Sequence, residues 1–96
     1  MLKVPKKSGL AFMTAFVEDY LAGKEGRLDW DVNFSHYFML HYPKMERESR
    51  DAAECFNFYL AEQGYDQGMG LPDDEHKALI RKQFELFNDT VRDGFF

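Results

Sequence analysis

Cysteine is nearly absent from this sequence, and that scarcity removes whole classes of protein. The single Cys55 cannot form a disulfide within the chain, nor can it supply a zinc site built from several cysteines. Long apolar runs are missing as well, since no segment approaches the length of a membrane span. The short apolar stretch 10–17 is followed at once by Glu18 and Asp19, so we expect it to be a helix and not a signal peptide. These features predict a cytoplasmic protein.

Positive charge is also scarce. Twelve lysines and arginines stand against 17 acidic residues, which gives a formal net charge of −5. Nucleic-acid binding needs a basic surface, so this acidic balance argues against it. Aromatic residues are abundant instead, with ten phenylalanines, five tyrosines and one tryptophan. A small domain has limited room for so many rings, and aromatic residues are also common in protein–protein interfaces.

Hydrophobic residues recur at helical spacing along most of the chain, which predicts an all-α fold. We expect helices at residues 8–22, 31–41, 43–63 and 72–93. Residues 1–7 read as a flexible basic arm and residues 8–96 as a single helical domain. Helices of this length with short links favour a compact four-helix bundle. The tight link between the second and third helices favours a steep crossing, so an irregular or orthogonal bundle is the alternative.

Glycine, proline and serine set the predicted helix boundaries. Ser8 is a suitable N-cap for the first helix, and Gly23 is a suitable left-handed C-cap. Pro43 is expected as the first residue of the third helix, because proline is favoured there. Gly64 is expected to end that helix, and Pro72 to open the fourth.

Residues 28–34 are ambiguous. Leu28, Trp30, Val32 and Phe34 alternate with polar residues as the side chains of a strand do. A lone strand would leave its backbone groups unpaired, so a helix is favoured. The helix predicted at 31–41 is more apolar than one core-facing side requires. It is either a central helix wrapped by the other three, or it presents an apolar side to a partner.

No arrangement of catalytic or metal-binding residues is recognisable. His36 and His41 are five positions apart and do not share a helix face, and His76 lies in the first turn of the last predicted helix. Cys55 lies on an apolar stripe and is expected to be buried. The glycine-rich loop 64–71 does not match a phosphate-binding motif. We therefore expect no catalytic residues, no metal and no cofactor.

The sequence thus favours a non-enzymatic helical protein of accessory or regulatory type that acts through protein–protein interaction. Its partner would be another protein or a second copy in a homodimer, and no membrane contact is expected. The candidate contact residues are all aromatic: Trp30, Tyr37, Phe38, Tyr42, Phe95 and Phe96. The alternative is a helical domain that binds a small ligand or a metal in a pocket between its aromatic-rich helices.

Overall fold

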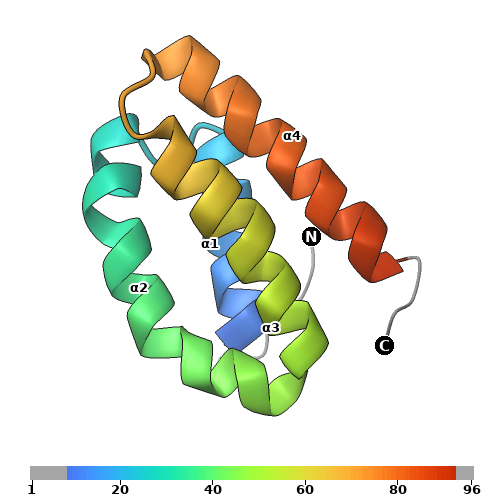
Figure 1. Ribbon diagram of the computed structural model, residues 1–96. Coiled ribbons are helices and arrows are strands. Elements are labelled where there is room, and N and C mark those ends of the chain that lie inside the picture. The colour runs from blue at the N-terminus through green and yellow to red at the C-terminus, as the bar shows by residue number, and fades with distance from the viewer. Residues whose placement is uncertain (1–8, 93–96) are drawn as a thin grey trace.

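Helices make up most of the part of the chain that the computed structural model describes, residues 9–92, and no strand occurs there. They are α1 (Gly9–Leu21), α2 (Arg27–Glu48), α3 (Arg50–Phe56), which runs directly into the π-helix η1 (Asn57–Asp66), and α4 (Asp73–Arg92). α1 packs mainly on α2 and η1 mainly on α4, with α2 and α4 on opposite sides of the molecule (Figure 1). The predicted all-α four-helix fold is confirmed. None of the helices within these residues combines the length and the hydropathy of a membrane span.

Stacked aromatic rings form the centre of the core. Trp30 is fully buried and lies parallel to Phe16 of α1, with 5.4 Å between the ring centroids. The indole also contacts Tyr20 at 4.7 Å and Phe34 at 4.8 Å. Phe34 in turn stacks on Tyr65 of η1 at 5.0 Å. Aromatic pairs of this kind stabilise a fold beyond their buried area, by about 0.5–1.5 kcal/mol each. Much of the aromatic surplus therefore lies in the core.

The C-terminus of α1 confirms the cap predicted at Gly23. This glycine has a φ of 83°, a left-handed conformation that a side chain disfavours. Its amide donates to the Tyr20 carbonyl, and the Lys24 amide donates to the Asp19 carbonyl. This pair of hydrogen bonds is the Schellman motif.

The N-terminus of α1 is held by a side chain from a distant part of the sequence. The predicted cap Ser8, like the predicted basic arm at residues 1–7, lies outside the described residues. The Glu48 carboxylate accepts hydrogen bonds from the Gly9 amide at 2.7 Å and the Leu10 amide at 3.0 Å. A negative charge there also complements the helix dipole. The end of α2 is thereby tied to the start of α1.

The predicted break at Pro43 is wrong, because α2 runs through it. Pro43 is exposed, and the Met39 carbonyl it leaves without an amide partner belongs to an exposed residue that water can solvate. The ribbon of α2 changes direction in this green part of Figure 1, as helices do at proline. The interruption comes instead at Ser49, which is extended (φ −164°, ψ 109°). Its side chain accepts a hydrogen bond from the Ala52 amide and caps α3.

The predicted helix end at Gly64 is also wrong, because η1 continues to Asp66. Gly64 is buried inside the π-helix and faces α4. A Cβ at this position would lie 3.1 Å from Cδ1 of Ile80 and 3.2 Å from the Tyr59 carbonyl oxygen. The residue therefore allows close approach of two helices, and it does not terminate one. The fourth helix begins at Asp73, one residue after the predicted start at Pro72.

Candidate functional site

α2 carries four large apolar side chains that the fold leaves in solvent. Leu28 is 74% exposed, Val32 62%, Met39 74% and Leu40 61%. Leu28, Val32 and Met39 lie close to one line along the helix, since 28, 32, 35 and 39 follow a four–three–four spacing. Ser35 occupies the remaining position of that line. We call Leu28, Val32, Ser35 and Met39 the outer face of α2, and Leu40 lies to one side of it.

The contact residues predicted from the sequence lie mainly on the other side of the same helix. Trp30 is fully buried, so its prediction as a surface contact is wrong. Tyr37, Phe38 and Tyr42 are half-buried and pack against the core. Phe95 and Phe96 lie outside the described residues. The signal that the sequence offered for the outer face was the alternation of Leu28 and Val32 with the core residues of segment 28–34.

Arg27, which the sequence analysis did not single out, ties the loop before α4 to the start of α2. Its side chain is only 15% exposed, and it donates to both carboxylate oxygens of Asp31 at 3.1 Å and to Asp73 at 3.3 Å. The same guanidinium donates to three backbone carbonyls of the loop, those of Gly68, Met69 and Leu71. An arginine can satisfy this many acceptors because its planar group carries five donors.

His76 is buried near Arg27, although no feature of the sequence predicted a buried polar residue at this position. Its Nδ1 lies 2.6 Å from the Tyr20 hydroxyl, and its ring also contacts Trp30. Burial lowers the pKa of His76, the nearby Arg27 cation lowers it further, and Asp31 and Asp73 act in the opposite direction. Burial likewise raises the pKa of Tyr20. Both rings are therefore neutral near pH 7, and their hydrogen bond joins α1 to α4.

A hollow of about 290 Å³ lies between α1 and α2. Aromatic rings and carboxylates line it together: Phe12, Ala15, Phe16, Asp19, Glu25 and Tyr37. The Phe12 and Phe16 rings both meet Tyr37 edge to face at 5.4 Å, which fixes the aromatic wall. Burial raises the pKa of Glu25, and the like charges of Asp19 and Asp29 raise it further. Negative charge is therefore crowded at one edge of an aromatic hollow.

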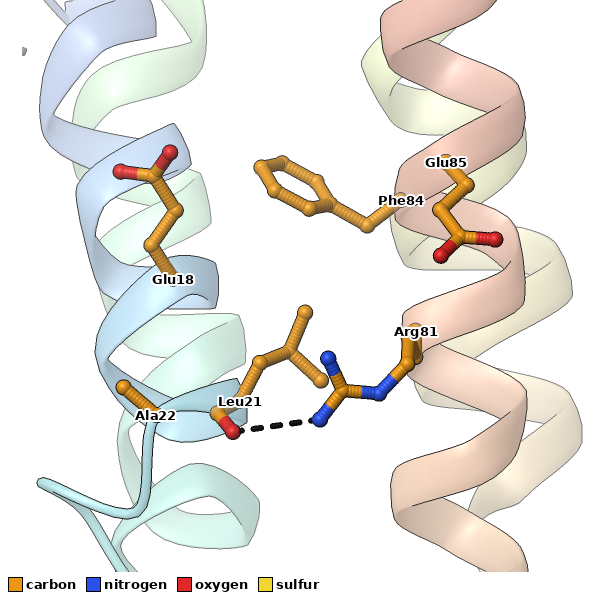
Figure 2. A pocket seen from close by; sticks show the side chains of 6 residues that line it. All are labelled: Glu18, Leu21, Ala22, Arg81, Phe84 and Glu85. Carbon is orange, nitrogen blue, oxygen red and sulfur yellow. Dashed lines mark hydrogen bonds between the residues drawn. The ribbon is translucent and has the colours of Figure 1, made fainter.

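A second hollow, of about 320 Å³, lies between α1 and α4. Figure 2 shows the Phe84 ring extending from α4 toward α1, with Glu18 on the opposite wall. Arg81 crosses the lower end, where its guanidinium donates to the Leu21 carbonyl at 3.3 Å. That bond satisfies a carbonyl at the C-terminus of α1, where a cation is also favoured by the helix dipole. This hollow is open, and its one arginine has a structural role.

The remaining reactive side chains have ordinary surroundings. Cys55 is buried, as expected, and burial raises the pKa of its thiol, so the thiolate is disfavoured. His36 is exposed on α2, whereas His41 stacks on Phe12 at 4.2 Å. Within residues 9–92, no three histidine, cysteine or carboxylate side chains converge as they would around a metal ion.

Comparison of the chain with known protein families, with curated proteins and with solved structures finds no match. The geometry described above is therefore the basis for the functional argument.

Proposed function

We propose that this is a non-enzymatic helical protein of accessory or regulatory type that acts through protein–protein interaction, with the outer face of α2 as its contact surface. The observation that carries the proposal is the exposure of Leu28, Val32 and Met39 along one line of α2. Single exposed apolar residues are common on protein surfaces, but a contiguous row along a helix is typical of a surface that another helix covers. The surface differs from the one predicted from the sequence, although it belongs to the same helix.

A second copy of the chain is the partner that the spacing favours. A two-fold interface requires that each residue pair with a residue at the mirrored position of the other copy. In an antiparallel pair of α2 helices centred between Val32 and Ser35, Leu28 of each copy lies opposite Met39 of the other. The bulky residues then meet at both ends, and Val32 meets the small Ser35 at the centre. The pattern is therefore self-complementary.

The polar pairs beside the outer face and the area of that face indicate how strong such a dimer would be. In the antiparallel arrangement Asp29 lies beside His36 of the second copy, whose ring can donate a hydrogen bond to the carboxylate. The row from Leu28 to Met39 is about 16 Å long, from a helical rise of about 1.5 Å per residue. The area of so short a strip, one helix wide, is below the roughly 800 Å² that each partner contributes to a stable interface. We therefore expect a weak dimer whose population rises with protein concentration.

Sedimentation analysis from micromolar to millimolar concentration tests the proposal. The wild-type protein should shift from monomer to dimer mass, and Leu28→Asp should remain monomeric because each interface would bury two unpaired carboxylates. Leu28 lies in the first turn of α2, where an added acid suits the helix dipole, so this variant should fold. Leu86→Asp on α4 is the matched control, and it should dimerise like the wild type.

Three results would count against this assignment. A monomeric wild type at every concentration would refute self-association. A second result would be the capture of another protein by the wild type but not by Leu28→Asp. If that protein then bound the purified chain, the outer face would serve a different partner, and the homodimer proposal would be wrong. Dimerisation of Leu28→Asp would refute the outer face itself.

A further inference from the structure

The hollow between α1 and α2 has a composition suited to one class of ligand. Three aromatic rings, Phe12, Phe16 and Tyr37, share it with the carboxylates of Asp19 and Glu25. Aromatic rings attract cations through the negative charge of their faces, and carboxylates attract them directly. We propose that this hollow binds an organic ammonium group. The proposal is independent of the outer face of α2, because Tyr37 lies on the opposite side of that helix.

The charges around the hollow support a cationic occupant. Glu25 forms no ion pair within residues 9–92, and it lies near the like charges of Asp19 and Asp29. Lys24 reaches Asp19 only at 4.0 Å, and both side chains are well exposed. An incoming cation would relieve repulsion that the protein's own lysine leaves largely uncompensated.

The lining also distinguishes an organic cation from a metal ion. Calcium and magnesium require six or more oxygen ligands, whereas much of this wall is aromatic and supplies none. A substituted ammonium group carries apolar carbons that pack against rings, and its diffuse charge needs no coordination sphere. The volume of about 290 Å³ is near the lower end of ligand sites, so a head group fits better than a large molecule.

Choline is the probe for a free small molecule, and the acetylated amide of trimethyllysine is the probe for the same group on a protein side chain. Amide chemical-shift mapping by NMR should place either probe between α1 and α2. The uncharged carbon isostere of choline, dimethylbutanol, has the same shape without the charge. We expect it to bind at least tenfold more weakly, because burial of its shape alone gains no electrostatic attraction.

Glu25→Gln removes one charge from the hollow and keeps the side-chain shape. It should weaken choline binding several-fold, whereas Glu85→Gln, which changes net charge equally but lines the other hollow, should leave it unchanged. Tighter binding of choline would indicate a free metabolite, and tighter binding of the lysine derivative a modified protein tail. The proposal would be overturned by equal affinity for choline and dimethylbutanol, by equal effects of the two variants, or by no shifts in residues of the hollow.

Discussion

Replacement of Arg27 with alanine is expected to destabilise the whole fold, because this side chain joins three parts of the chain. Its guanidinium lies at the start of α2 and is largely buried. It donates to two carboxylates, one on α2 and one at the start of α4, and to three backbone carbonyls of the loop 68–71. No other described side chain reaches that loop with as many hydrogen bonds.

The size of the effect follows from what water can replace. A hydrogen bond to a charged group contributes about 1.5–3 kcal/mol when it is shielded from solvent. The loop carbonyls regain water once the side chain is gone, and the carboxylate pairs lie near the surface, where each contributes about 0.5 kcal/mol. We therefore expect Arg27→Ala to lower the free energy of unfolding by about 3 kcal/mol, since most but not all of its hydrogen bonds are replaced. For a domain of this size that corresponds to a fall in melting temperature of about 12–24 °C.

Urea denaturation followed by circular dichroism measures this loss. Arg50→Ala is the matched control, because Arg50 is 78% exposed and within residues 9–92 forms an ion pair only with Glu54. We expect a loss below about 0.5 kcal/mol. Hydrogen exchange should also show lost protection at the Met69 amide, which donates to the Asp66 carbonyl at the end of η1, and at the Leu71 amide, which donates to the Gly68 carbonyl. Equal unfolding midpoints for the two variants would refute the assignment of Arg27 as the residue that ties the loop before α4 to α2.

Two further predictions concern the neighbourhood of His76. Gly68→Ala should lower the free energy of unfolding by about 1–3 kcal/mol in the urea assay, because its Cβ would lie 2.9 Å from Cδ2 of His76. A Cβ at Gly70 meets nothing within 4 Å, so Gly70→Ala is the control and should be tolerated. Equal unfolding midpoints for the two variants would contradict the clash. Burial, reinforced by Arg27, lowers the pKa of His76 below its ordinary 6.5, so the unfolded chain binds a proton that the folded chain resists. The free energy of unfolding should therefore have its full value above about pH 6.5 and decrease as the pH falls below it. His76→Gln should make that decrease shallower. A slope unchanged in this variant would assign the pH dependence to other groups.

The fold was predictable from sequence wherever the signal was local. Helical spacing of apolar residues located all four helices, and Gly23 marked a true C-cap because its left-handed conformation depends on neighbouring residues alone. Pro43 and Gly64 misled for a tertiary reason. The flanks of Pro43 pack into the core, which keeps α2 continuous. Gly64 is required by close packing against Ile80 of α4. Neither contact can be read from the residues beside it.

The candidate sites were less predictable than the fold, because they depend on which side of a helix faces the core. The aromatic content correctly drew attention to the segment that became α2. Trp30, however, is the largest apolar residue there, and burial of its surface gains the most free energy. The hollow between α1 and α2 depends on the approach of Glu25 and Asp19 to rings from two helices, which no spacing within one helix encodes.

α2 is apolar on two opposite sides, and only one of them serves the fold. Its inner side supplies Trp30 and Phe34 to the core, whereas Val32 and Met39 on the outer side remain largely in solvent. Side chains that stay exposed in the folded chain gain little free energy on folding, since hydrophobic stabilisation follows the area removed from water. Stability of the monomer therefore does not account for the outer residues. Val32→Asp should consequently leave the unfolding midpoint of the monomer nearly unchanged while it abolishes self-association. Loss of stability without loss of association would mean that this residue serves the fold after all.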